Sequence, residues 1–146
     1  MLNSLRAVPS RHQSLVLNDA GQVLLVETSN RTTLTLPGGA AGKGEPPHLA
    51  ARRHLESATG LVRALRCLLV ADYTAARRPF TFIHWGGRLT LDDAAAVQHR
   101  RAVHWVDESV FPDVLAPDDH RRLAHALAFY TFGSILPVLV DGAPPE

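Results

Sequence analysis

The stretch from Leu36 to Leu61 constrains the fold of this chain more than any other part of its sequence. Its sequence, LPGGAAGKGEPPHLAARRHLESATGL, predicts a glycine-rich turn, a short charged loop and then a helix. The prolines at 46 and 47 suit the first helical turn, because the N–H groups that they lack would have no partner there. Gly60 suits the position just after the helix, where a left-handed residue ends it. The stretch therefore predicts a strand, a turn and a helix in direct succession.

The expected helix has two different faces. At about 100° per residue, one broad face carries mostly small or apolar side chains: Ala50, Ala51, His54, Leu55, Ser57 and Ala58. The other face carries Arg52, Arg53 and Glu56. Because Glu56 lies about 200° around the helix from His54, it should point away from that histidine and form an ion pair with Arg52 or Arg53.

The same stretch resembles the Nudix box of the diphosphate-cleaving hydrolases. The pattern of that box is Gly, five residues, Glu, seven residues, then Arg-Glu-aliphatic-x-Glu-Glu-x-Gly-aliphatic. The positions that match it without a gap are Gly39, Glu45, Arg53, Leu55, Gly60 and Leu61. The helix glutamates that hold metal in the family are replaced here by His54, Ser57 and Ala58. The resemblance covers roughly residues 13 to 130 and implies an α+β fold, an α/β/α sandwich with a mixed β-sheet.

The rest of the chain supplies further strands and helices in an order that fits such a sandwich. Strands are expected at residues 14–17, 23–27, 32–36, 62–73, 80–85, 103–106 and 135–140. A turn at 18–21 should join the first two strands as a hairpin. A short helix at 108–111 with Asp107 as its cap and a longer helix at 117–130 are expected, whereas residues 89–100 suit either a helix or a loop.

Length and charge exclude several classes of protein. The 146 residues suit one domain, which we place at 13–140 between an N-terminal segment (1–12) and a flexible tail (141–146). A net charge of +1 provides no field to recruit nucleic acid or membrane, and we expect neither partner. The single cysteine, Cys67, cannot form an internal disulfide, and the N-terminus does not resemble a signal peptide. A cytoplasmic protein is expected.

The replaced glutamates bear directly on metal binding. In an intact Nudix box, carboxylates on one helix face bind Mg²⁺ or Mn²⁺, which bridges the diphosphate and activates water. An imidazole, a hydroxyl and a methyl group are poor ligands for these hard ions. We therefore expect no metal ligands and no cofactor, with Mg²⁺ or Mn²⁺ needed only if the protein is a hydrolase with non-standard ligands.

The candidate catalytic residues are His54 and Glu45. His54 occupies a family metal-ligand position, and an imidazole can give or take a proton near neutral pH. The alternative is a histidine that bonds to a neighbour in an inactive site. By the resemblance, Glu45 pairs with Arg53 and holds the loop against the helix, although either residue can instead contact a ligand.

Four residues are candidates for substrate binding: Arg53, Tyr73, His84 and Gly39. Gly39 can expose a backbone N–H to an anion, but a tight turn would need a glycine without any ligand. His84 should share a strand face with Phe80 and Phe82, where with Tyr73 and Asp72 it either reaches a cavity or lies in the core.

Three functions remain open. The first is a Nudix-fold enzyme repurposed for metal-independent acid–base chemistry on a small metabolite, as in a biosynthetic step. The second is a metal-dependent hydrolase of nucleoside diphosphate derivatives with non-standard ligands, and the third is a non-catalytic ligand-binding domain. A homodimer is a further possibility by the resemblance. The uncharged segment 126–140 is its candidate surface, with core packing as the alternative for that segment.

Overall fold

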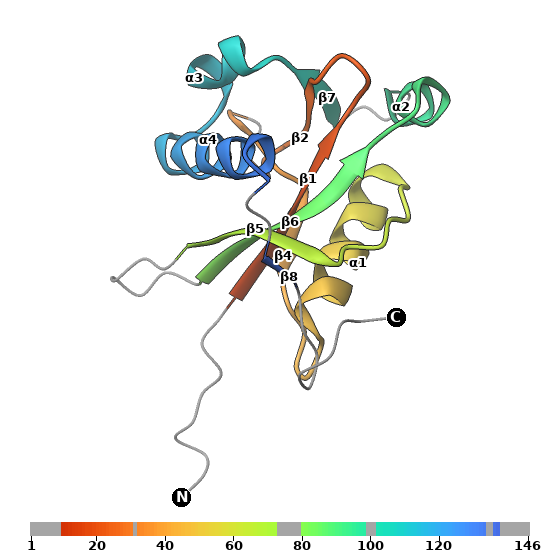
Figure 1. Cartoon of the computed structure of the whole chain (residues 1–146), viewed down its shortest axis with the longest axis vertical. Coiled ribbons are helices and arrows are strands. Elements are labelled where there is room, and N and C mark those ends of the chain that lie inside the picture. The colour runs from red at the N-terminus through yellow and green to blue at the C-terminus, as the bar shows by residue number, and fades with distance from the viewer. Residues whose placement is uncertain (1–9, 31, 73–79, 99–101, 134–135, 138–146) are drawn as a thin grey trace, which may run out of the picture.

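The computed structural model describes residues 10–30, 32–72, 80–98, 102–133 and 136–137. Its strands form one eight-stranded mixed sheet, with helices on both sides (Figure 1), so the predicted α+β sandwich is confirmed. The strands are β1 (Ser10–Leu17), β2 (Val23–Glu27), β3 (Leu34–Thr35), β4 (Gly38–Ala40), β5 (Cys67–Asp72), β6 (Phe80–Arg88), β7 (Val103–Val106) and β8 (Leu136–Pro137). The helices are α1 (Pro47–Thr59), α2 (Leu91–Gln98), the 3₁₀ turn η2 (Glu108–Val110), α3 (Phe111–Val114) and α4 (Pro117–Thr131).

Strand β1 is the centre of the sheet, whose order is β3-β2-β1-β6-β5-β8. It pairs antiparallel with β2 and with β4, and parallel with β6. The predicted hairpin between β1 and β2 is confirmed. Asn18 closes its turn by accepting a 2.8 Å hydrogen bond from the Gln22 N–H, and Gly21 adopts a φ of 79°.

Helix α1 has the ends that the sequence predicts. It begins with Pro47 and is ended by Gly60, whose φ is 77° and whose N–H donates to the Glu56 carbonyl at 2.8 Å. Ala50, Ala51 and Leu55 are fully buried against the sheet. The helix is thus fixed to the sheet by the small and apolar face expected from its periodicity.

Several strand predictions need correction. Gly38 and Gly39 do not form a turn but belong to β4, in register with Gln13 and His12 of β1. Strand β5 starts at Cys67 rather than at residue 62, and β6 continues past Trp85 through both following glycines. Glycine is depleted in strands and has no side chain that alternates between two faces, so the sequence at 38–40 predicted a turn where the structure has a strand.

The helices at the other end of the chain agree better with prediction. Residues 91–98 form a helix, which decides between the two structures expected there. Asp107 does occupy the N-cap position of η2, but its side chain makes no capping hydrogen bond. Helix α4 confirms the expected helix at 117–130 and buries Leu123 and Ala126.

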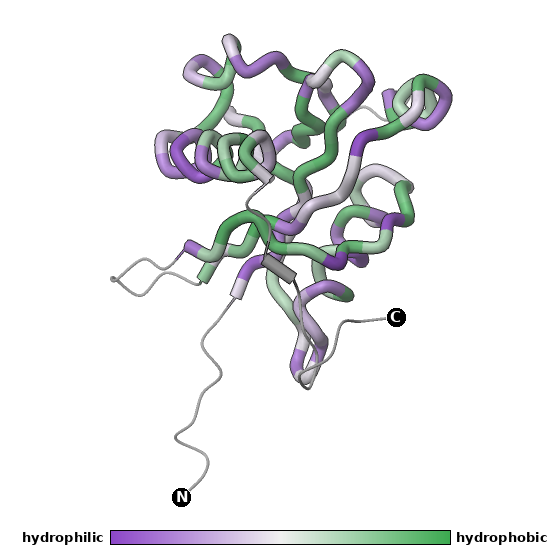
Figure 2. Tube along the Cα trace, in the orientation of Figure 1, coloured by the Kyte–Doolittle hydropathy of each residue, from purple (hydrophilic) through white to green (hydrophobic). Residues whose placement is uncertain are grey.

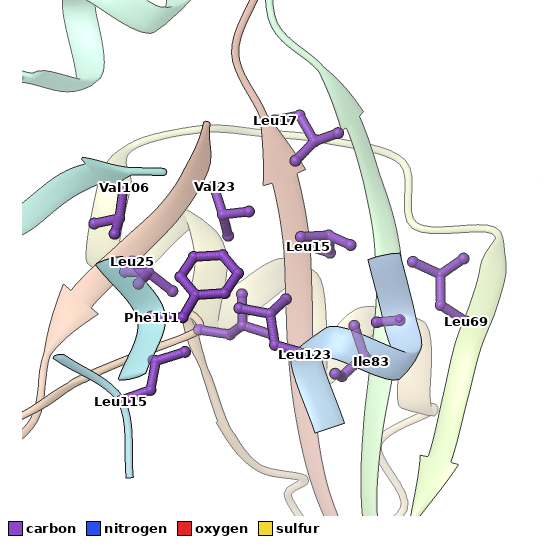
Figure 3. Close-up of a cluster of buried hydrophobic side chains, with 12 residues drawn as sticks. Leu15, Leu17, Val23, Leu25, Leu69, Ile83, Val106, Phe111, Leu115 and Leu123 are labelled. Atoms are coloured by element: carbon purple, nitrogen blue, oxygen red, sulfur yellow. The ribbon is translucent and has the colours of Figure 1, made fainter. Parts of the chain in front are cut away.

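Two hydrophobic clusters hold the layers together, one on each face of the sheet. Alternation along β1 sends Leu15 and Leu17 into one cluster with Leu123 of α4, and Val16 into the other with Leu55 of α1. Figure 3 shows the first cluster, where Phe111 and Leu123 lie beside strand residues. In Figure 2 β5 and the part of β1 next to β2 are green, β6 is partly pale, and the two long helices alternate between green and purple.

The predicted domain limits are partly outside the described residues. β1 begins at Ser10, so residues 10–12 belong to the sheet rather than to an N-terminal segment. The tail at 141–146, Tyr73 and most of the expected strand at 135–140 lie outside the described residues, and of that strand only Leu136 and Pro137 pair with β5. No helix among the described residues is long and apolar enough to cross a membrane.

Candidate functional site

The loop before α1 is fixed to the helix by the expected ion pair between Glu45 and Arg53. Arg53 donates from Nε to Glu45 Oε2 and from Nη2 to Oε1, both at 2.9 Å. The Gly42 N–H donates to the same carboxylate at 2.9 Å. These hydrogen bonds lower the pKa of Glu45 to about 2, and the bond from Arg53 has the largest effect. Near neutral pH the carboxylate is ionised and already occupied, which suits an architectural role better than proton transfer.

His54 lies over β4, and its ring explains Gly39. A Cβ atom added at Gly39 would stand 2.7 Å from His54 Nε2, so any larger residue would require the imidazole to move. Nε2 is 2.8 Å from the Ala40 carbonyl oxygen, which can only accept, so this nitrogen carries the proton. Arg53 Nη2, also a donor, stands 3.4 Å away and does not hydrogen-bond to that tautomer. Nδ1 is then the nitrogen that can accept a proton.

The remaining family metal positions do not fit a hard divalent ion. Ser57 is exposed and Ala58 has no donor atom, while Glu56 is exposed on the side away from β4. Among the described residues, no three His, Cys, Asp or Glu side chains are arranged to hold a metal ion. Glu56 forms no ion pair with the described arginines, and Arg53 is paired with Glu45 instead. The expected pair of Glu56 is therefore a prediction that the structure corrects.

A pair of buried histidines lies beneath α1, next to His54. The register of β1 with β6 pairs His12 with Phe82 and Ser14 with His84. His12 Nδ1 is 3.1 Å from His84 Nε2, and its other nitrogen is 2.9 Å from the Ser10 hydroxyl. The His12 ring stacks on Phe82 at 5.1 Å between centroids. Both histidines are almost wholly buried, at 1% and 0% exposure.

Burial keeps this pair of imidazoles neutral. Desolvation is the main cause that lowers the pKa of His84 to about 3, with smaller effects from His12 and His48. Burial also lowers the pKa of His12, an effect opposed by the charge of Glu45 and increased by His54. The coupling to Glu45 and His54 shows that the buried pair and the Nudix-box residues form one electrostatic neighbourhood.

Three buried polar atoms in this neighbourhood have no partner among the described residues: Ser14 Oγ, His48 Nδ1 and His84 Nδ1. Ser14 and His84 are opposite each other in adjacent strands, and His48 acts on the pKa of His84. Buried polar groups in folded proteins normally have a protein, water or ligand partner.

The sequence predictions identified only part of this site. Gly39, Glu45, Arg53 and His54 come together as expected, and His84 is on the predicted face with Phe82 but fully buried. Asp72 is not beside His84, because it pairs in register with Thr81 and bonds to Arg122 at 2.9 Å.

His12 and His48 were missed. A β1 strand begun at Ser10 would have placed His12 on the same face as Ser14 and Val16. His48 stands three residues before Ala51, on the buried face of α1. Both signals were therefore present in the sequence.

Comparisons with known proteins agree on the fold. The family model described as "NUDIX domain" matches residues 12–127. A NUDIX hydrolase from Nitrosomonas europaea is 18% identical with a TM-score of 0.67, over 94% of this chain and 100% of that one. A MutT protein from Methanosarcina mazei Go1 is 17% identical with a TM-score of 0.64, over 85% and 94%.

The NUDIX domain of Shewanella oneidensis NrtR, solved with ADP ribose, is also similar. It is 19% identical with a TM-score of 0.62, over 88% of this chain and 92% of that one. A search of curated proteins gave no match. At these identities the solved structures establish the fold, and the chemistry has to be argued from the residues.

Proposed function

Because the chain belongs to the Nudix superfamily, we propose that it is a Nudix-fold enzyme with a repurposed site, which carries out acid–base chemistry on a small metabolite without a metal ion. His54 is the catalytic acid or base in this proposal. The ion pair between Glu45 and Arg53 positions the loop beside it. A small-molecule substrate and a biosynthetic role are parts of the same proposal.

One observation carries the proposal, namely the way His54 is held. Its Nε2–H is fixed by the Ala40 carbonyl and its ring rests against Gly39, so Nδ1 is left as an acceptor in a defined orientation. A carbonyl that fixes one ring nitrogen is a common way to select the tautomer of a working histidine. The ring is only partly buried, so a substrate can reach it. A well-placed acid or base contributes roughly 10²–10⁴-fold to a rate.

The other candidate residues take different parts in the proposal. Glu45 has a structural role in this proposal and does not transfer a proton, because its carboxylate is hydrogen-bonded to Arg53 and Gly42. Contact of substrate with Arg53, Tyr73, His84 or Gly39 stays a prediction. His84 and Gly39 are each covered by protein atoms, which favours an indirect role for both. A homodimer also stays a prediction, for which Phe132, 82% exposed in segment 126–140, is an available contact.

Turnover in the absence of metal tests this function. Protein treated with a chelator would be incubated with pooled small metabolites, and their consumption followed by NMR or mass spectrometry. We expect turnover that persists with the chelator, falls at least 10²-fold in His54→Gln, and is kept in the matched control His104→Gln on β7. Full turnover in His54→Gln would remove the main support for the proposal.

A ligand-binding domain without catalysis is the second candidate. It is favoured by the engagement of Glu45, which leaves His54 as the only family-position side chain with a free acceptor near β4. The NrtR domain solved with ADP ribose makes that compound a reasonable probe. A thermal shift with ADP ribose and no product, with or without Mg²⁺, would support this candidate. Cleavage that requires Mg²⁺ or Mn²⁺ would instead support the hydrolase with non-standard ligands.

A further inference from the structure

Arg63 is held in an unusual setting after α1. Its half-buried side chain lies against the end of β6, where Nε–H donates to the Gly86 carbonyl at 2.9 Å. It forms no ion pair with the described residues, whereas Arg53, Arg121 and Arg122 each pair with a carboxylate. A guanidinium carries five N–H donors, and one of them has a hydrogen-bond partner among the described residues. The remaining four form a planar fork with a full positive charge.

The backbone of β6 is shaped to admit this guanidinium. Gly86 is the extra residue of a β-bulge, because Leu15 pairs with Trp85 while Val16 pairs with Gly87. A Cβ at Gly87 would overlap Arg63 Nη2, and the φ of Gly87 is 92°, which favours glycine. The missing side chain of Gly87 thus leaves room for Arg63 against the strand backbone.

A pocket of about 360 Å³ opens beside the guanidinium, within the range usual for small-ligand sites. Its lining residues are Val62, Arg63, Ala64, Trp85, Gly86 and Gly87, of which Arg63 alone is charged. The Trp85 ring stacks on the Tyr130 ring, with 4.1 Å between the ring centroids. Val62 is an apolar side chain with 54% of its surface exposed. The pocket therefore combines one cation with an apolar wall.

We propose that this pocket binds a small organic carboxylate, with its carboxyl group on Arg63 and its apolar body against Trp85. Guanidinium donors match the two oxygens of a carboxylate in a bidentate geometry. The single charge of the pocket is neutralised by a monoanion, whereas a phosphate dianion would leave one negative charge uncompensated. The apolar wall adds affinity for a hydrocarbon or aromatic body and none for an inorganic ion.

This site is separate from the one around His54. Gly86 and Gly87 lie opposite Leu15 and Val16, further along β1 than His12. The proposal does not require acid–base catalysis, and it holds if the Nudix-box site proves inactive.

Titration with sodium benzoate at constant ionic strength, followed by ¹H–¹⁵N NMR of the full chain, tests the proposal. We expect saturable shifts at the Gly86 and Gly87 amides and at the Trp85 indole. Arg63→Gln should weaken binding roughly 10–100-fold, the value of a charge-assisted hydrogen-bonded contact. Arg63→Lys keeps the charge but loses the planar fork of donors, so its affinity for benzoate should lie between those of the wild type and Arg63→Gln. Arg66→Gln, at an exposed arginine three residues on, is the matched control and should bind like the wild type.

Two comparisons on the wild-type protein keep the proposal falsifiable if a variant fails to fold. Benzamide, which has the same ring but no charge, should bind much more weakly than benzoate. Inorganic phosphate should also bind more weakly. Unsaturable shifts, equal binding of benzoate and benzamide, or tighter binding of phosphate would each overturn the proposal.

Discussion

The buried pair of His12 and His84 should make the stability of this fold depend on pH in a defined window. His84 has a pKa lowered from 6.5 to about 3 by burial, so the folded protein keeps it neutral where the unfolded chain protonates it. Because the unfolded state binds more protons, stability falls as the pH falls from 6.5 towards 3. Above pH 6.5 both states are neutral at this residue, and its contribution does not change.

The size of the effect follows from the two pKa values. Each pH unit between them contributes about 1.4 kcal/mol per group, so moving from pH 7.5 to pH 5 should remove about 2 kcal/mol through His84. His12 is shifted in the same direction and adds to the loss. Glu45, whose pKa is lowered from its ordinary value of 4.5 to about 2 in the folded protein, acts only below this window. A loss of about 2 kcal/mol is a large part of the 5–15 kcal/mol typical of a domain.

Urea unfolding at several pH values between 5 and 7.5, followed by tryptophan fluorescence, measures this loss. His84→Gln removes the titrating group while its amide can hydrogen-bond to His12. The quantity compared is the change in unfolding free energy with pH, not its absolute value. We expect this variant to lose about 2 kcal/mol less than the wild type over that range. His104→Gln, which removes an imidazole whose side chain is 44% exposed, should behave like the wild type. An identical pH dependence in the wild type and His84→Gln would refute the reasoning.

Three further predictions concern single contacts. Gly39→Ala should displace the His54 ring and lower stability by about 1–3 kcal/mol in urea unfolding, whereas Gly42→Ala, with nothing closer than 3.6 Å to its new Cβ, should cost less. Glu45→Gln should speed hydrogen exchange at the Gly42 amide, and in the wild type the same bond should weaken only as the pH falls to about 2, where the folded protein protonates this carboxylate. Leu123→Ala, at a wholly buried side chain, should cost about 2–5 kcal/mol in thermal or urea unfolding, whereas Phe132→Ala should change stability little.

The parts of the fold that local sequence controls were the parts that could be predicted. The β1–β2 hairpin depends on the turn at Asn18 and Gly21, and α1 on its prolines and Gly60, so each carries its own signal. The His12–His84 bond depends on a parallel pairing between strands far apart in the chain. The sequence can place His12 and His48 on buried faces, but no local pattern fixes the register of such a strand pair. The contact of His12 with His84 therefore became visible only in the structure.

The structure also separates what the Nudix-box matches say about fold from what they say about chemistry. Gly39 is explained by the ring of His54, and Glu45 by its bonds to Arg53 and Gly42. Each of these matched residues has a packing or bonding role that needs no metal and no diphosphate. The match of these residues to the family pattern therefore indicates the fold and does not identify the reaction. The chemistry has to be judged at positions 54, 57 and 58, where His54 alone offers a group that can exchange a proton near neutral pH.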